Sequence, residues 1–130
     1  MDNTPYMIPA KATEYNGRIY RSRLEARVAA YYDILGLSFE YEPMDYPKWS
    51  PDFLVTYNGY KTLIEVKYDN SLFNITKYLD VDFNHFNIGF MSQNKLIIIG
   101  KNKIDCKEHK DISEWIEAGN KVMFLKPQDI

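Results

Sequence analysis

Two acidic residues and a lysine are spaced so that a β-hairpin would bring them together. Asp52 lies just before one run of residues typical of a strand, and Glu65 and Lys67 lie near the end of the next run. The Asn58-Gly59 pair between the runs is the strongest short signal for a two-residue hairpin turn. If the residues flanking this turn pair, Asp52 falls opposite Glu65, and residues paired in this way have Cβ atoms about 4.5–5.5 Å apart. Lys67 projects from the same face as Glu65, because side chains alternate along a strand.

Such an arrangement has the chemistry of a metal site. Two close carboxylates repel each other unless a cation lies between them. Mg²⁺ prefers oxygen ligands and is typically held by one or two carboxylates together with phosphate oxygens. Lys67 beside the pair would hold an attacking water or steady a phosphate, which completes the parts for metal-assisted hydrolysis of a phosphodiester. The structural alternative is that Glu65 and Lys67 form a solvated ion pair and that Pro51-Asp52 is an ordinary strand-entry dipeptide.

The hairpin belongs to a longer series of predicted elements. Ser22 and Glu25 form a capping box, an apolar stripe follows at Leu24, Val28, Tyr31 and Leu35, and Gly36 ends the helix. In chain order we expect a helix over 22–36, strands over 39–42, 53–57 and 60–67, a helix within 71–90, a strand over 95–100, a helix over 111–119 and a strand over 121–125. Residues 1–21, which contain an Asn16-Gly17 turn, are predicted to form an irregular arm. The order α-β-β-β-α-β-α-β predicts an α/β (α+β) fold, with a mixed β-sheet flanked by helices in a single domain spanning 1–130.

The composition fits one globular domain and excludes several classes of protein. Of the 130 residues, 45% are apolar and 15% aromatic, which is enough to build a core and argues against disorder. The 16 basic and 18 acidic residues exclude a uniformly basic nucleic-acid binder, but they do not exclude a local basic patch. The single cysteine, Cys106, excludes an intrachain disulfide framework and fits a reducing compartment. Because no apolar run approaches the roughly 20 residues of a membrane span and no secretory signal begins the chain, we expect a cytoplasmic protein without a membrane partner.

Three blocks of the sequence resemble the PD-(D/E)xK nuclease superfamily. The blocks are YRSRLEARVAAYYDILGLSFEYEP, then SPDFLV, then LIEVK, and they cover about residues 19–68 in the order of the family. The likeness is closest to phage-type endonuclease I, a Holliday junction resolvase, and to small phage nucleases with an R-S-x-L-E helix. It implies a restriction-endonuclease-like core and a Mg²⁺-dependent endonuclease, with Mn²⁺ as a substitute, that cleaves DNA in a bacterial or phage-infected cell. Junction-resolving relatives act as dimers, so a homodimer is an option, and no small-molecule cofactor is implied.

The resemblance also implies a role for each matching residue. Asp52 and Glu65 match the two acidic metal ligands, and the carbonyl of Val66 would be a further ligand. Lys67 matches the catalytic lysine. Glu25 matches the glutamate of the first helix that helps to build the metal site, so capping and catalysis would coexist at this residue.

All four arginines of the chain lie within ten residues, around the start of the helix that carries Glu25. Cations near a metal site would meet the phosphate backbone, which supplies most of the non-specific affinity for DNA. We therefore predict a nucleic-acid-binding cluster made of Arg18, Tyr20, Arg21, Arg23 and Arg27. The alternative is a solvated face on which these arginines pair with neighbouring acids.

The sequence departs from the family pattern in a few places. Tyr68 stands where relatives often have Gly, and Val28 stands where many have Trp. After the lysine motif, relatives of the endonuclease I type carry several basic residues, whereas this chain has Lys77 alone among the acids Asp69, Asp80 and Asp82. This acidic segment motivates an alternative function: a non-catalytic protein with a nuclease fold that binds DNA or takes part in an assembly. Cleavage of RNA by the same chemistry is also open.

Overall fold

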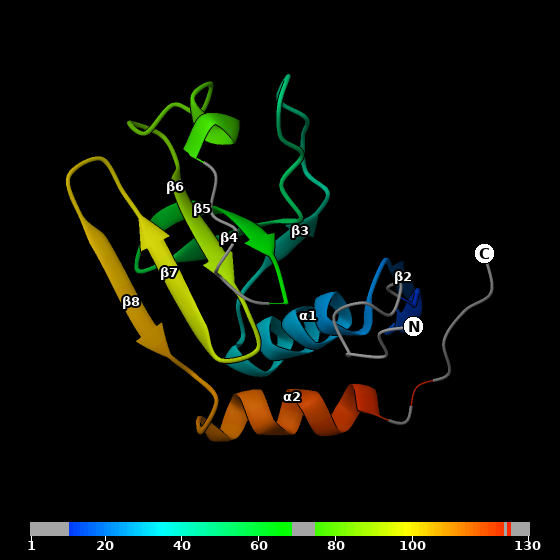
Figure 1. The fold of residues 1–130 in the computed structure, drawn as a ribbon. Coiled ribbons are helices and arrows are strands. Elements are labelled where there is room, and N and C mark those ends of the chain that lie inside the picture. Colours follow the sequence, from blue (N-terminus) through cyan, green and yellow to red (C-terminus); the bar gives the residue numbers. More distant parts are fainter. Residues whose placement is uncertain (1–10, 69–74, 124, 126–130) are drawn as a thin grey trace, which may run out of the picture.

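The computed structural model describes residues 11–68, 75–123 and 125, which form an α+β fold (Figure 1). A mixed six-stranded sheet has the strand order β3-β4-β5-β6-β7-β8, and β1 and β2 form a separate two-stranded sheet. The mixed sheet with helices confirms the coarse prediction of the fold class. The elements are β1 (Thr13–Tyr15), β2 (Arg18–Tyr20), α1 (Arg23–Leu35), β3 (Phe39–Tyr41), β4 (Phe53–Tyr57), β5 (Tyr60–Val66), the 3₁₀ helix η2 (Ile75–Tyr78), β6 (Asn87–Met91), β7 (Lys95–Ile99), β8 (Ile104–Glu108) and α2 (Ser113–Met123).

The predicted hairpin is confirmed as β4 and β5. Tyr57 pairs with Tyr60 across a turn in which Asn58 and Gly59 both have left-handed backbone angles, with φ of 49° and 85°. Two such residues are what a type I′ turn requires. The regular ladder ends at the pair Phe53–Ile64, one step short of the predicted pairing of Asp52 with Glu65. Beyond this point the Asp52 N–H donates to the Ile64 carbonyl at 2.8 Å, so the two acidic residues lie where the ladder becomes irregular.

The sheet continues on both sides of this hairpin. β3 pairs with β4 in an antiparallel manner, β6 pairs with β5 in parallel, and β6, β7 and β8 form an antiparallel series. The parallel pairing requires a crossover between the end of β5 and the start of β6, and η2 lies in this crossover.

Helix α1 begins and ends where the sequence predicts. Ser22 accepts a hydrogen bond from the Glu25 N–H at 3.0 Å, and Gly36 ends the helix in the left-handed conformation with φ of 73°. The buried face is wider than the predicted stripe, since it includes Ala26, Ala29, Ala30 and Tyr32, whereas Leu35 is exposed. The reason is that α1 is covered twice, by the sheet and by α2, and the alanines allow both to approach closely.

Both α-helices lie on one face of the sheet (Figure 1). The core on this face joins α1 to Phe53, Val55 and Ile64 of the sheet, and it joins α1 to α2 through Trp115 and Val122. The other face is covered without an α-helix, by aromatic and aliphatic residues from the segment before β4 and from the β5–β6 crossover: Trp49, Tyr78 and Val81, which pack with Leu63, Ile88 and Phe90. Within the described residues, the predicted flanking helices are therefore found on one face only.

The largest difference from the predicted elements lies between β5 and β7. A helix was expected within 71–90, but residues 69–74 fall outside the described part, and residues 75–91 contain the short η2 and then strand β6. Phe83 and Phe86 lie in irregular chain and pack against the core on the face of the sheet opposite the α-helices. The β6 strand is mostly buried without alternation, which is typical of an interior strand and is hard to distinguish from a helix by periodicity.

The last third of the chain also differs in part. The strand predicted over 95–100 is confirmed as β7, but β8 was not predicted, because its residues IDCKE are mostly polar and exposed at the edge of the sheet. Helix α2 runs through Gly119, so the predicted stop there and the predicted strand over 121–125 are wrong, with residue 124 outside the described part. Gly119 lies against α1, where a Cβ atom would stand 2.8 Å from the guanidinium carbon of Arg27.

The N-terminal arm is more regular than predicted. Residues 1–10 fall outside the described part, but β1 and β2 form a hairpin around the Asn16-Gly17 turn. These strands have three residues each, which is too short for alternation to be recognised in the sequence. No helix among the described residues is long and apolar enough to cross a membrane.

His109, which is buried beside α2, should make the stability of the fold depend on pH. Its Nε2 lies 2.8 Å from the Ser92 carbonyl oxygen, and burial lowers its pKa from 6.5, with the Arg27 charge acting in the same direction. As the pH falls through 6.5 the unfolded chain therefore binds the proton first, so the free energy of unfolding should decrease as the pH falls below about 6.5. In His109→Gln, whose amide can still donate to Ser92, urea unfolding should lose this part of the pH dependence. Stability curves that differ between the two proteins by the same amount at every pH would contradict the prediction.

Candidate active site

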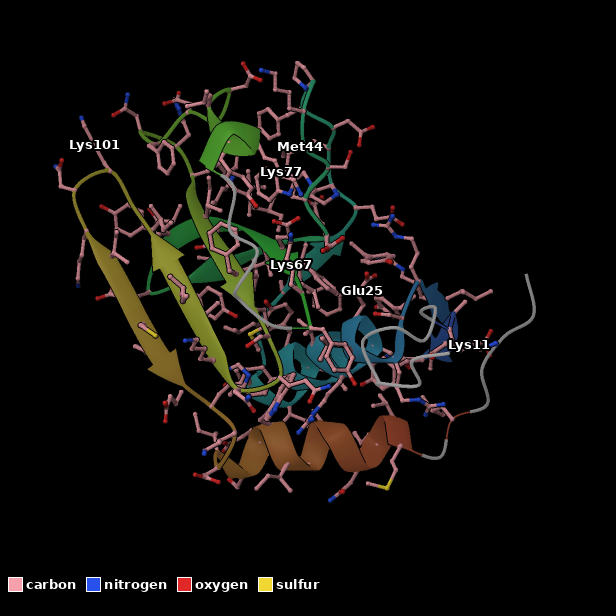
Figure 2. The ribbon with its side chains drawn as sticks, viewed as in Figure 1. Lys11, Glu25, Met44, Lys67, Lys77 and Lys101 are labelled. Atoms are coloured by element: carbon pink, nitrogen blue, oxygen red, sulfur yellow. The ribbon has the colours of Figure 1, made fainter. Side chains whose placement is uncertain are left out.

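The three predicted acidic residues line one pocket. Glu25, Asp52 and Glu65, together with Val66, contribute to a hollow of about 480 Å³ formed by the start of α1, the end of β5, η2 and the segment before β4. The remaining lining residues are Arg21, Ser22, Lys48, Trp49, Ser50 and Lys77. Figure 2 shows Glu25, Lys67 and Lys77 on the side of the molecule between α1 and η2. Residues from four separate segments are thus brought together, as the resemblance implied for Glu25, Asp52 and Glu65.

Glu25 reaches the pocket because it occupies the first turn of α1. Its backbone N–H is used by the Ser22 cap, which leaves the carboxylate for other contacts. That carboxylate accepts a hydrogen bond from the Tyr41 hydroxyl, and Tyr41 in turn accepts one from the Arg21 N–H at 3.1 Å. The residue is only 8% exposed, and burial raises the pKa of Glu25 above its ordinary value, although the Tyr41 hydrogen bond opposes the rise. The Ser22 cap thus uses the backbone N–H of Glu25, whereas the carboxylate, which a capping box would turn toward the Ser22 N–H, contacts Tyr41 in the pocket.

Asp52 is buried, which disfavours its charged form, although a positively charged arginine lies beside it. Its Oδ2 accepts the Val66 N–H at 2.8 Å, and its Oδ1 lies 3.0 Å from Nη2 of Arg21. Burial nevertheless raises the pKa of Asp52 to about 7, with the charge of Glu25 as the next cause and that of Glu65 as a smaller one. A carboxylate of this kind gains from any additional cation that enters the pocket.

Glu65 is held by two consecutive residues of η2. The Tyr78 hydroxyl donates to Oε2, and Nζ of Lys77 lies 3.6 Å from Oε1. Lys67 follows Glu65 by two residues, and its Nζ lies 4.0 Å from the same Oε1. This contact agrees with the expectation that Glu65 and Lys67 project from the same face. Lys77 lines the pocket whereas Lys67 does not, so Lys67 joins the site through its contact with Glu65.

The donor set has the chemistry of a site for a hard divalent cation. Carboxylate and carbonyl oxygens are the ligands that Mg²⁺ prefers, and a bound cation would relieve the repulsion among three buried carboxylates. Within the described part of the chain, however, no three Asp, Glu, His or Cys side chains stand close enough to hold a metal ion in their present positions. Asp52 is paired with Arg21, and Glu65 with Lys67 and Lys77. Binding of a metal therefore requires that some of these protein cations give way.

The predicted nucleic-acid-binding cluster is divided by the fold. Arg18 is exposed on β2, and Arg21 lines the pocket with 60% of its side chain exposed. Arg21 lies 3.7 Å from Glu42 as well as 3.0 Å from Asp52, so it pairs with neighbouring acids, as the alternative interpretation of the cluster expected. Tyr20 is 3% exposed and packs between other aromatic rings, which makes it a core residue.

Arg23 and Arg27 contact α2. Arg23 donates to the carbonyls of Val122, Met123 and Leu125, at the end of α2 where helical carbonyls lack partners within the helix. Arg27 stacks on the ring of Trp115, with Cζ 3.9 Å from the ring centroid, and donates to the Trp115 carbonyl at 2.9 Å. Both guanidinium groups thus hold α2 against α1, and we leave them out of the proposed contacts with nucleic acid.

Four residues of the site were not predicted from the sequence. Tyr41 and Tyr78 bind two of the acids, and Lys48 and Lys77 line the pocket. A signal existed for Lys77, because it is the only basic residue between Tyr68 and Phe90. Tyr41 lies in a correctly predicted strand, but nothing in the local pattern distinguishes its hydroxyl from that of any other tyrosine.

Comparisons with models of known protein families, with curated proteins and with solved structures give no match for this chain. The function of the pocket is therefore inferred from its own residues and from the resemblance of the sequence motifs.

Proposed function

We propose that this chain is a Mg²⁺-dependent endonuclease of the PD-(D/E)xK type that hydrolyses DNA, with branched DNA among its substrates. The observation that carries the proposal is the meeting of Glu25, Asp52 and Glu65 in one pocket, from a helix and a hairpin in the order of the family motifs. Three buried carboxylates in one place are costly to keep charged, and such an arrangement is typical of a functional site.

The arrangement of the elements around the pocket supports a restriction-endonuclease-like core. Helix α1 is followed by the antiparallel strands β3, β4 and β5, by a crossover, and by β6 in parallel with β5. The resemblance implies the order helix, three strands, helix, strand. In the described residues the 3₁₀ helix η2 takes the place of the second helix.

The residues of the pocket have complementary roles in this proposal. Asp52, Glu65, Glu25 and the Val66 carbonyl would hold Mg²⁺, which when bound supplies Lewis-acid stabilisation of the phosphate and lowers the pKa of a bound water. Lys67, beside Glu65, positions the attacking water or steadies the phosphate. Arg21 gives up its contact with Asp52 and contacts a neighbouring phosphate of the DNA strand. The water oxygen bonds to phosphorus and gives up a proton to the solvent, the P–O bond to the leaving nucleoside breaks, and the leaving oxygen takes up a proton from the solvent.

The direct test is incubation of the protein with plasmid, branched and single-stranded DNA, and with RNA, in Mg²⁺ or Mn²⁺. We expect metal-dependent cleavage of at least one DNA substrate, and a loss of about a hundredfold or more in Lys67→Ala, since Lys67 stands beside a metal ligand. RNA as the preferred substrate would keep the chemistry and change the substrate class. The proposal fails if no nucleic acid is cleaved, or if cleavage persists unchanged in Asp52→Ala and Lys67→Ala.

A non-catalytic DNA-binding or assembly protein is the second candidate, and one observation favours it. The carboxylates of Asp52 and Glu65 are already paired with protein cations, as in a site that no longer binds metal. Calorimetry with Mg²⁺ alone separates the two candidates. Binding that is lost in Glu65→Gln supports the enzyme, and the absence of such binding together with intact DNA affinity supports the non-catalytic protein.

A further inference from the structure

Lys77 stands at a point of the pocket where a protein cation and a metal would compete for the same acid. Its Nζ lies 3.6 Å from Oε1 of Glu65, and it lines the pocket. Its neighbour Tyr78 binds the other carboxylate oxygen of Glu65 through a neutral hydroxyl. One short element therefore holds Glu65 with one charged group and one uncharged group.

These two contacts respond differently to a divalent cation. A neutral hydroxyl can continue to donate to a carboxylate that coordinates a metal, and such outer contacts orient metal ligands in many proteins. An ammonium group is repelled by the metal, because both are positive and would share one carboxylate. The Lys77 side chain is 36% exposed, so it has room to swing away from Glu65 into the open part of the pocket.

We propose that Lys77 exchanges partners during the reaction: it pairs with Glu65 before metal binds, and it binds a substrate phosphate once Glu65 coordinates the metal. This inference rests on the proposed function and assigns a substrate-binding role to a residue outside the resembling motifs. Lys77 is the only basic residue of the segment between Tyr68 and Phe90, which is otherwise acidic. A single lysine in this segment has a chemical reason to line the pocket if it neutralises Glu65 first and a substrate phosphate afterwards.

The other cations of the pocket indicate where the phosphate would lie. Lys48 and Arg21 line the same hollow from two further segments. Together with Lys77 they place three positive side chains around the three acids. This arrangement suits a polyanion whose phosphates contact these cations and a metal held by the acids. A phosphodiester backbone matches this charge pattern, because Lys binds phosphate as a point charge without a fixed geometry.

The test compares Lys77→Met with wild type in two measurements that should move in opposite directions. In calorimetry with Mg²⁺ alone, the variant should bind the metal about two- to fivefold more tightly, because the competing partner of Glu65 is gone. In steady-state cleavage at saturating Mg²⁺, the variant should show a KM for DNA about tenfold higher with a smaller change in kcat, because a phosphate contact is lost. Lys77→Arg should restore both values to near those of wild type.

A matched control is Lys101→Met, at the turn between β7 and β8, away from Glu25 and Lys77 in Figure 2. It should leave both measurements unchanged. Weaker Mg²⁺ binding in Lys77→Met would overturn the exchange, because it would show that Lys77 only orients Glu65. An unchanged KM in Lys77→Met, beside a wild-type protein that cleaves DNA, would also overturn it, whereas a wild-type protein that cleaves nothing would instead overturn the proposed function.

Discussion

Asp52→Asn is expected to reduce Mg²⁺-dependent cleavage about a thousandfold and, at pH 8, to stabilise the protein against unfolding. The loss of activity follows because the amide replaces a charged metal ligand. The gain in stability follows because Asp52 is only 7% exposed and burial, with Glu25 and Glu65 nearby, raises its pKa from 3.8 to about 7. A shift of this size corresponds to roughly 4 kcal/mol once both the folded and the unfolded states are ionised. An increase of about 2–4 kcal/mol in the free energy of unfolding is therefore expected.

The pH dependence of this gain has a definite sign. Below about pH 4, Asp52 is protonated in both states and the variant should differ little from wild type. Between about pH 4 and 7 the unfolded chain loses its proton while the folded chain keeps it, so the wild type becomes less stable as the pH rises. Above about pH 7 Asp52 is ionised in both states, and the full free-energy cost of its buried charge destabilises the wild type. The difference between Asp52→Asn and wild type should thus grow from pH 4 to 8 in urea unfolding.

Mg²⁺ should reduce the difference in the free energy of unfolding between Asp52→Asn and wild type, because it binds the folded wild type and not the variant. Asp80→Asn, at an exposed position after η2, serves as the matched control and should leave both cleavage and stability unchanged. A destabilised Asp52→Asn protein at pH 8 would show that the carboxylate holds the fold together through Arg21 and Val66. Asp52 would then be a structural residue, and the metal site would lose its central ligand.

The parts of the site that the sequence predicts are those fixed by local geometry. The Asn58-Gly59 turn determines the register of the hairpin, and the Ser22 cap determines the phase of α1. These two local signals decide which way Glu65 and Glu25 point from their own elements, and the packing of α1 on the sheet then brings the two into one pocket. For the same reason Asp52 lies close to its predicted partner Glu65. The two residues do not form a regular pair of the ladder, because the Asp52 carboxylate takes the place of a backbone acceptor for the Val66 N–H.

The parts that the sequence does not predict depend on contacts between distant segments. Lys77 reaches Glu65 only because the crossover folds back over the end of β5, and no local periodicity encodes that path. Arg23 and Arg27 belong by sequence to a basic cluster, yet their direction is decided by contacts with a residue beyond α2 and with α2 itself, which lie 102 and 88 residues later in the chain. A count of charges along the chain therefore overestimates the surface available to nucleic acid.

Arg21 and Arg23 are two residues apart, and the structure predicts different effects when each is replaced by Met. Arg23→Met should lower the free energy of unfolding by about 2–3 kcal/mol, because three carbonyls at the end of α2 lose their charged donor. Arg21→Met removes an exposed pocket cation, so it should weaken DNA binding and reduce the slope of log K against log salt by about 0.9, the value for one phosphate contact.

Both measurements are best made in the Asp52→Asn background, in which DNA cleavage is expected to be strongly reduced and the charged partner of Arg21 at position 52 is removed. There Arg21→Met should change the salt dependence of DNA binding, followed by fluorescence anisotropy, with little change in stability. Arg23→Met should change stability, followed by urea unfolding, with no change in the salt dependence at temperatures where it is folded. Equal losses of DNA affinity in the two variants would show that both arginines contact DNA, as the sequence predicts. The different roles of the two arginines arise from helix geometry, because residues two apart on or beside a helix point in different directions. Of these two arginines, only Arg21 lines the pocket.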